Sequence, residues 1–395
     1  MTLPRKDLFH LPDGVIYLDG NSLGPLPKTT SARVAETVQT EWGDDLIRAW
    51  NTRGWMDQPA RLGDRIAPLI GAPPGSMMVG DTLSIKVFQA LSAALDLVPD
   101  RWVILSDTGN FPSDLYMAHG LAALKEQGHE LRLVDPDQIE AAMDETVAAV
   151  LLTQVDYRTG ARHDMARLTR AAHDAGAVMI WDLAHSAGAI EVDLAGSGCA
   201  FAVGCTYKYL NAGPGAPAFI YVRPDLADRV TPALSGWLGH ADPFAFDRDY
   251  HPAPGMGRMR VGTPPVLQMA ALDAALDIWE DVDLPTLWAA SEVLSQRFID
   301  GVEATCPALR LISPHNPKQR GSQVSFAVKN AYPIMQALID HGVIGDMRAP
   351  DILRFGIAPL YLDATDIDRA VNILSRILKD RIWDRAEYKA RKPVT

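Results

Sequence analysis

Seven short runs of apolar residues follow one another between about residues 75 and 225, with helical periodicity between several of them. The runs lack the polar alternation of a strand that has one face in water, so they suit strands buried on both faces. Such strands alternating with helices predict a mostly parallel sheet wrapped by helices. In chain order the runs are MMVG, WVILS, ELRLV, VAAVLLT, AVMIWD, AFAVG and PAFIYV.

One helix between these runs can be predicted together with its ends. Asp164 is suited to cap its first turn, and Gly176 is suited to end it. Met165, Leu168 and Ala172 then fall on a common face. Since ligands in such folds bind beyond the carboxyl ends of the strands, candidate site residues are sought just after the apolar runs.

The pattern changes after residue 265. Residues 266–305 predict two helices interrupted near Pro285, and the strand-like pieces LRLI, QVSFAV and ILRFGI follow. Thr365 and Asp368 have the spacing of a capping box at the start of a last helix. These elements predict a smaller α/β domain. The apolar face of its last helix is expected to contain Ile367, Val371, Leu374 and Leu378.

The length of 395 residues, 48% of them hydrophobic, is enough for a large core in two lobes. We expect a large α/β domain over residues 51–270 and a small one over residues 271–395. The N-terminal residues 1–50, with an amphipathic region near 30–50, are expected to pack on the small domain.

Charge and cysteine content narrow the function classes. The net charge of −12 argues against nucleic acid and anionic membranes as main partners. No run is long enough for a signal peptide or a membrane span. Cys199, Cys205 and Cys306 show no metal-ligand spacing, and no metal site is expected. They are interpreted as reduced, mostly buried thiols of a cytoplasmic protein; Cys205, close to Lys208, is a core residue or part of a site lining.

The most informative pair of residues is Asp182 and Lys208. Asp182 closes the run AVMIWD, and Lys208 follows the run AFAVG in GCTYKYLNAGPG. A carboxylate against a pyridine nitrogen keeps that nitrogen protonated, which makes the ring an electron sink. A lysine that can shed its proton forms a Schiff base and moves protons. The pair therefore predicts an enzyme that uses pyridoxal phosphate.

Several nearby residues suit the rest of such a site, and each also has a structural alternative. Leu83 and Ser84 begin a helix whose N–H groups could bind phosphate, unless the turn is an ordinary N-cap. Phe111 could stack on the ring or simply pack, and Asp114 could orient polar groups or cap a helix. His185 could lie beside the ring or have a structural role, and Tyr207 could bind the phosphate or move a proton. Thr153 is the last candidate, because it ends a predicted strand.

Three further features suggest a substrate site. Arg354 lies in the strand-like ILRFGI, where a buried arginine is costly unless it holds an anion such as a carboxylate; the alternative is a partly exposed side chain. Trp55 and Trp237 lie in glycine-flanked loops that are not expected to be deep core, and suit an aromatic substrate or a subunit interface. The loop PAPGMGRMRVGTPP, which contains Thr263, is expected to lack regular structure and to serve a site or an interface.

A nucleotide phosphate-binding loop and an α/β-hydrolase are disfavoured, because the chain has no GxxxxGK[ST] and no GxSxG motif. Its segments DGNSLGPLPK, FPSDLY, VDYRTG, WDLAHSAG, GCTYKYLNAGPG, LSGWLGH and MRVGTPP resemble those of the kynureninase family. The resemblance runs from about residue 15 to residue 380. It implies the fold type I, aminotransferase-like fold of pyridoxal phosphate enzymes.

The resemblance also implies roles for individual residues. Lys208 would hold the cofactor as an aldimine and act in catalysis with Tyr207 and Asp182. Trp237 and Thr263 would reach the phosphate from the other subunit of a homodimer. The implied cofactor contacts are Leu83, Ser84, Phe111, Pro112, Ser113, Asp114, Thr153, Asp182, His185, Tyr207, Lys208, Trp237 and Thr263. The implied substrate contacts are Arg354, Trp55 and Ser22.

The implied reaction is the hydrolysis of L-kynurenine to anthranilate and L-alanine in tryptophan degradation. Some family members carry Asn at the position of Thr263 and His near that of Trp55, which leaves the preference between kynurenine and 3-hydroxykynurenine open. The alternative is another reaction of the same fold, such as transamination or cysteine desulfuration. A desulfurase would need a cysteine in a mobile loop, and none of the three lies in a suitable one.

Overall fold

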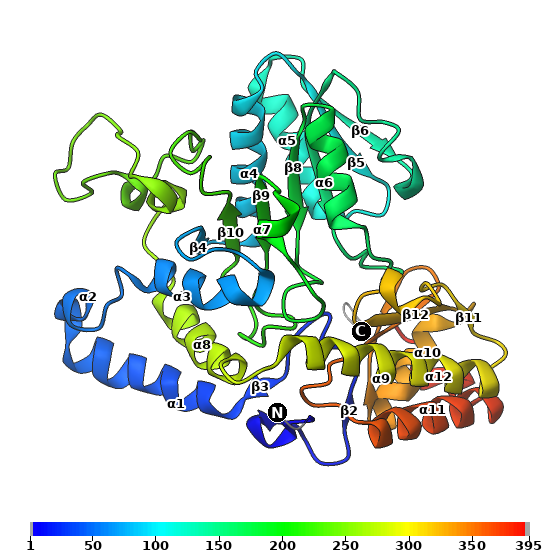
Figure 1. The fold of residues 1–395 in the computed structure, drawn as a ribbon. Helices are drawn as coiled ribbons and strands as arrows, with labels where there is room; N and C mark the ends of the chain where they lie inside the picture. Colours follow the sequence, from blue (N-terminus) through cyan, green and yellow to red (C-terminus); the bar gives the residue numbers. More distant parts are fainter. Residues whose placement is uncertain (1–2, 392–395) are drawn as a thin grey trace.

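The computed structural model describes residues 3–391, and its centre is a seven-stranded sheet formed by the seven apolar runs (Figure 1). The strand order is β4-β10-β9-β8-β7-β5-β6. Only β10 runs antiparallel to its neighbours, so the prediction of a mostly parallel sheet is confirmed. The strands are β4 (Met77–Val79), β5 (Val103–Asp107), β6 (Glu130–Val134), β7 (Val147–Thr153), β8 (Val178–Asp182), β9 (Phe201–Gly204) and β10 (Phe219–Val222).

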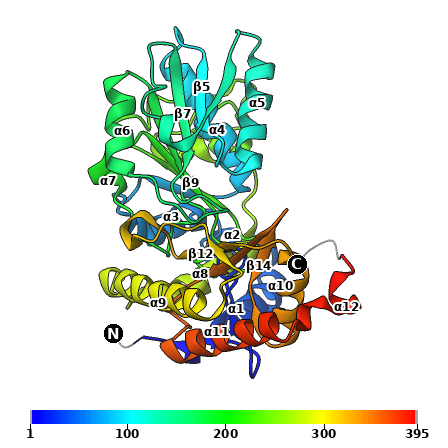
Figure 2. The same ribbon diagram turned by 90° about the vertical axis from the view of Figure 1, so that its right-hand side faces the viewer.

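Helices cover both faces of this sheet. Figure 2 shows α6 (Met165–Asp174) on one side and α4 (Leu83–Leu97) with α5 (Pro112–Lys125) on the other. Helix α6 begins as predicted, because the Asp164 carboxylate accepts the N–H of Arg167. Its buried face includes Met165, Leu168 and Ala172, as the sequence predicted. Gly176, just beyond its end, has the positive φ of +74° that glycine adopts readily.

The C-terminal part forms a second, four-stranded sheet in the order β11-β12-β15-β14, covered by long helices. The interruption between two helices that was predicted near Pro285 lies just before this residue. Pro285 itself belongs to the first turn of α9, where proline is tolerated. The strands are β11 (Arg310–Leu311), β12 (Gln323–Ala327), β14 (Asp346–Arg348) and β15 (Ile352–Gly356). The long helices of this part are α9 (Leu284–Thr305), α10 (Ala331–Asp340) and α11 (Ala364–Lys379); the short α12 (Ala386–Lys389) follows them, and α8 (Val266–Leu276) precedes them.

The predicted capping box of the last long helix is wrong by two residues. Asp363, not Thr365, is the N-cap of α11, and its carboxylate accepts the N–H of Asp366 at 3.0 Å. In the reciprocal hydrogen bond, the Asp366 carboxylate accepts the N–H of Asp363. The inward face is correct for Ile367, Val371 and Leu374, but Ile377 takes the fully buried place expected for Leu378.

The N-terminal residues contact both halves of the molecule. Strand β2 (Ile16–Tyr17) pairs in parallel with β13 (Val343–Ile344), and β1 (Phe9–His10) pairs with β3 (Leu26–Pro27). Helix α1 (Lys28–Glu36), continued by a π-helix over Thr37–Asp44, packs against α8 instead. The domain boundaries expected at residues 50 and 270 stay a prediction. Helix α8 runs across the second of them. Three short helices complete the described chain, α2 (Ala49–Thr52), α3 (Gln58–Ile66) and α7 (Leu194–Ser197).

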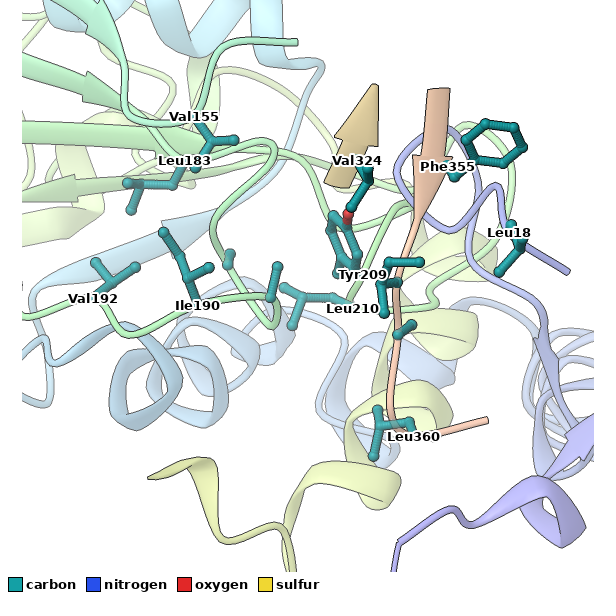
Figure 3. Close-up of a cluster of buried hydrophobic side chains, with 14 of the residues drawn as sticks. Leu18, Val155, Leu183, Ile190, Val192, Tyr209, Leu210, Val324, Phe355 and Leu360 are labelled. Carbon is teal, nitrogen blue, oxygen red and sulfur yellow. The ribbon is translucent and has the colours of Figure 1, made fainter. Parts of the chain in front are cut away.

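A continuous apolar core joins the two halves. Figure 3 shows Leu183 and Ile190, from the segment after β8, in the same buried cluster as Val324 and Phe355 of the small sheet. Within that cluster the Tyr209 hydroxyl donates to the carbonyl of Ser322 at 2.8 Å. This packing fixes the segment that follows Lys208 against the C-terminal part. Among residues 3–391, no helix is both long and apolar enough to cross a membrane.

Candidate active site

The register of the large sheet brings the ends of its central strands together. Asp182 ends β8 and pairs with Thr153, which ends β7. On its other side Asp182 pairs with Val203 of β9, the strand that leads into Lys208. Because these three strands are parallel, the segments that follow them leave from the same edge of the sheet. The chain therefore brings Asp182 and Lys208 to one edge.

Lys208 lies among aromatic side chains at this edge. Its Nζ is 3.0 Å from His185 Nε2, 6.0 Å from the centre of the Phe111 ring and 5.8 Å from that of Tyr207. Burial and the charge of Lys208 lower the pKa of His185 well below its usual range, so the imidazole is neutral and its Nε2 accepts from the amine. Burial raises the pKa of Tyr207, which keeps its phenolic proton.

The Asp182 carboxylate is buried and held by groups from neighbouring strands. Its Oδ1 accepts the N–H of Ala184 at 2.9 Å, and the Thr153 hydroxyl is 3.4 Å from Oδ2. The same hydroxyl donates to Asn110 Oδ1 at 2.5 Å. Burial raises the pKa of Asp182, and the charge of Lys208 opposes that shift. A second cation beside this carboxylate would stabilise its ionised form further.

Two buried polar groups near Asp182 lack partners among the described residues. Asp114, in the first turn of α5 after Pro112 and Ser113, is fully buried with neither carboxyl oxygen hydrogen-bonded. Burial and the neighbouring Asp182 raise its pKa well above the usual range. His185 Nδ1 is also buried and unpaired. Buried polar groups are normally satisfied, so these orphaned atoms fit a polar ring bound against them.

The turn from β4 into α4 suits a phosphate. Val79 and Gly204 pair with the same residue of β10, so this turn leaves the sheet close to the Lys208 segment. Thr82 precedes the helix and makes no side-chain cap. The N–H groups of the first turn, which include those of Leu83 and Ser84, therefore have no intrahelical acceptor and can bind an anion.

Arg354 is connected to the same site through its hydrogen bonds. It is 1% exposed, which excludes the alternative of a partly exposed side chain. Its Nη1 donates to the carbonyl of Tyr157 at 2.6 Å, and the Tyr157 ring lies edge-on to Phe111 with centres 5.0 Å apart. Ser22 Oγ is 3.2 Å from Nη2. The buried guanidinium holds a carboxylate, as expected, but this carboxylate is that of Asp346 in the same chain.

The surroundings of Trp55, Trp237 and Thr263 differ from those of the residues around Lys208. Trp55 is 8% exposed and donates its indole N–H to Glu41 at 2.8 Å, so the expectation that it avoids the core is wrong. The buried glutamate gives its polar edge a partner. Trp237 is 46% exposed and Thr263 is also exposed. The loop before Thr263 is also more regular than predicted, since Gly255–Met259 forms a 3-10 helix.

Sequence reasoning missed four residues of this site. Asn110 links β5 to β7, donating to Ser106 and to the carbonyl of Leu151 while accepting from Thr153. Tyr157 bridges Phe111 and Arg354. The other two missed residues are Asp346 and Arg348. The signal available was an aspartate and an arginine alternating in GDMRAP, which predicts a strand with two charges on one face.

Solved structures with this architecture cover nearly the whole chain. The apo cysteine desulfurase from Thermococcus onnurineus NA1 matches with a TM-score of 0.81 at 20% identity, over 96% of this chain and 99% of that one. A C-DES variant with glycine covalently linked to its PLP cofactor matches with a TM-score of 0.79 at 19% identity, over 94% and 99%. This fold is that of the fold type I class of pyridoxal phosphate enzymes.

Sequence similarity places the chain within that class. Residues 287–374 match the family model of the kynureninase C-terminal domain. The kynureninase of Pseudomonas fluorescens is 48% identical over 399 residues, which cover 99% of this chain and 96% of that relative. The chain belongs to the kynureninase family, as its motifs predicted.

Proposed function

We propose that this protein is a pyridoxal phosphate-dependent kynureninase that hydrolyses L-kynurenine to anthranilate and L-alanine. The observation that carries the proposal is the convergence of Asp182 and Lys208 at one edge of the sheet, in a chain of the kynureninase family. The unpaired Asp114 carboxyl and His185 Nδ1 support a ring bound between these groups.

The residues of the site divide the work of this reaction. When bound, pyridoxal phosphate supplies an electron sink for bonds at the substrate α-carbon. Asp182 would hold a proton on the ring nitrogen, and Leu83 and Ser84 would bind the phosphate with their N–H groups. Lys208 would hold the cofactor and then remove the α-proton with its amine. Neutral His185, which accepts from Lys208 Nζ, positions that amine.

Tyr207 is the proposed proton donor to the alanyl fragment. Its phenol keeps its proton because burial raises its pKa, and Lys208 Nζ lies 5.8 Å from its ring centre. Arg354 would bind the substrate carboxylate beside Ser22. Phe111, half-exposed above the Lys208 amine, would stack on the ring.

Cysteine desulfuration is disfavoured by the environment of the thiols. All three cysteines are free and buried. Burial raises the pKa of Cys199 to about 12 and also raises the pKa values of Cys205 and Cys306. Thiols of this kind are poor nucleophiles, whereas desulfuration needs an accessible one. The free thiols also support the proposed cytoplasmic location.

Product analysis tests the proposed reaction directly. The enzyme loaded with pyridoxal phosphate is incubated with L-kynurenine or 3-hydroxykynurenine, and the aromatic product and L-alanine are measured together. We expect equimolar anthranilate and L-alanine from L-kynurenine. Pyruvate or a keto acid of the intact substrate, in place of alanine, would contradict the proposal. The ratio of kcat/KM for the two substrates then gives the ring preference.

We further propose a homodimer in which each subunit completes the site of the other. Two segments of the chain, both at the left of the ribbon in Figure 1, contain apolar residues that are exposed. One contains Trp42 and Ile47; the other contains Trp237, Phe244 and Phe246, whose rings contact each other. Exposed aromatic clusters of this kind are typical of interfaces. A partner would cover both segments and bring Trp237 and Thr263 to its own site.

Phe246→Asp is expected to weaken this dimer. Phe246 is 74% exposed, so the change disturbs little within one subunit, but it would bury a carboxylate in an apolar interface. Sedimentation velocity at low micromolar concentration should show monomers for this variant and dimers for the wild type. Val293→Asp, at a residue 66% exposed on α9, is the matched control and should remain dimeric. A Phe246→Asp variant as dimeric as the control would contradict the proposed interface.

A further inference from the structure

Arg354 and Asp346 form a cross-strand ion pair in the small sheet. The two residues lie directly opposite each other in the β14–β15 register. Arg354 Nε donates to Asp346 Oδ1 at 2.7 Å, and Nη2 donates to Oδ2 in the two-pronged geometry that suits a carboxylate. Both side chains are almost fully buried. One positive charge is therefore already balanced before any substrate arrives.

A second guanidinium binds the same carboxylate. Arg348 Nη1 is 2.8 Å from Asp346 Oδ2, and the Ser22 hydroxyl also donates to that oxygen at 2.8 Å. The Arg348 side chain is 36% exposed, so it borders the buried pair. Its Nε and Nη2 make no hydrogen bond among the described residues, which leaves N–H donors free for a ligand.

The charges of this cluster do not balance. Arg348 and Arg354 contribute two positive charges, and Asp346 contributes one negative charge. The other carboxyl group nearby is Asp19, whose pKa is raised to about 7 by burial and by the charge of Asp346. Asp19 is therefore largely protonated below neutral pH. Up to one positive charge remains without a counter-charge, and a partly buried cation in that position favours an anion.

The two arginines influence the proposed active site through their charge. The positive charges of Arg354 and Arg348 both lower the pKa of His185, the residue bonded to Lys208 Nζ. Arg354 also bonds to Tyr157, whose ring contacts Phe111. Arg348 is joined to Arg354 through the Asp346 carboxylate, and this cluster reaches Phe111, beside Lys208, through Tyr157.

We propose that Arg348 is a second arginine of the carboxylate site, so that the substrate α-carboxylate binds to Arg348 and Arg354 together. Asp346 is the positioning residue that holds the two guanidinium groups side by side. The inference rests on the proposed function for the identity of the substrate, and it names a binding residue and a positioning residue for that same site. A second arginine also explains how the site can bind a carboxylate although Asp346, Tyr157 and Ser22 already accept most of the N–H groups of Arg354.

The test compares two ligands that differ only in the carboxylate. L-Alanine, the expected product, and L-alaninamide, its neutral-headed analogue, are titrated into the enzyme loaded with pyridoxal phosphate, and binding is followed by the cofactor absorbance. For Arg348→Gln, the dissociation constant of L-alanine should rise about tenfold or more, as expected for loss of a charged hydrogen-bonding partner. That of L-alaninamide should stay within about threefold. Arg348→Lys keeps the positive charge, so its dissociation constant for L-alanine should rise less than that of Arg348→Gln.

Kinetics and a matched variant complete the test. Arg348→Gln should raise KM for L-kynurenine with little change in kcat, because the contact is made equally in the ground and transition states. Arg297→Gln removes another arginine paired with an aspartate, Asp368, on the exposed surface of α9 and should leave both ligands unaffected. An equal loss for L-alanine and L-alaninamide, or no loss for either, would overturn the proposal. If Arg348→Gln weakened the binding of L-alanine but not of L-alaninamide, while the wild type did not turn over L-kynurenine, only the proposed function would be contradicted.

Discussion

We expect the Lys208→Ala variant to hydrolyse L-kynurenine at least about 10⁴-fold more slowly than the wild type. The amine has two tasks, holding the cofactor and removing the α-proton, and within residues 3–391 no other lysine is bonded to His185 Nε2. Lys86 cannot replace it, because that residue is fully buried and bonded to Asp81 and Gln89. Anthranilate fluorescence under single-turnover conditions gives the rate.

Lys318→Ala is the control for loss of a lysine charge. Its side chain is 74% exposed and pairs with Glu292 on the surface, so it should retain wild-type turnover. Added methylamine separates a lost amine from a disturbed fold, since it should restore part of the activity of Lys208→Ala only. Normal turnover by Lys208→Ala would contradict the assignment of this residue.

Asp182→Ala is expected to reduce kcat by about a thousandfold, through loss of the carboxylate that keeps a proton on the ring nitrogen. The neighbouring Asp114 cannot take over as an ionised partner, because burial raises its pKa well above the usual range. Asp182→Asn should show a similar loss, since an amide is close in shape but carries no charge. Rates are measured at saturating L-kynurenine with excess cofactor.

Asp107→Asn gives the matched comparison for a buried aspartate at a strand end. Asp107 ends β5, is buried, and pairs with His163 at 2.8 Å. Its substitution should lower stability but leave kcat within about threefold, as expected for a change outside the reacting groups. If Asp182→Ala and Asp107→Asn reduced kcat by the same small factor, Asp182 would have only a structural role.

The large sheet could be predicted from the sequence because its strands are almost entirely buried, except the edge strand β6, whose residues are exposed or partly exposed, contrary to the expectation of burial on both faces. A continuous apolar run such as VAAVLLT is stable only where both of its faces are buried, as in the centre of a sheet covered by helices. Each of the seven runs forms a strand of the sheet. The small sheet was only partly predictable. Strand β14 is three residues long, contains Asp346 and Arg348, and is held by pairing with β15, which no local pattern of hydrophobic residues reveals. The start of α11 was misplaced because two acidic residues, Asp363 and Asp366, satisfied its first N–H groups ahead of Thr365.

The candidate site was predictable where one strand end determines a residue's position. Asp182 and Thr153 follow from their strands, and the parallel register places them side by side. Arg354 was recognised, but its partner Asp346 was not, because the pairing depends on the unpredicted β14. Trp55 was misjudged because its burial depends on a distant acceptor, Glu41.

Trapping the cofactor on its lysine shows which residue of the chain holds pyridoxal phosphate. The protein loaded with pyridoxal phosphate is reduced with borohydride, digested, and analysed by mass spectrometry for the peptide that retains the phosphopyridoxyl group. The account predicts one modified residue, Lys208, and loss of the modification in Lys208→Ala. A phosphopyridoxyl group on Lys86 or on a surface lysine, with Lys208 unmodified, would contradict it.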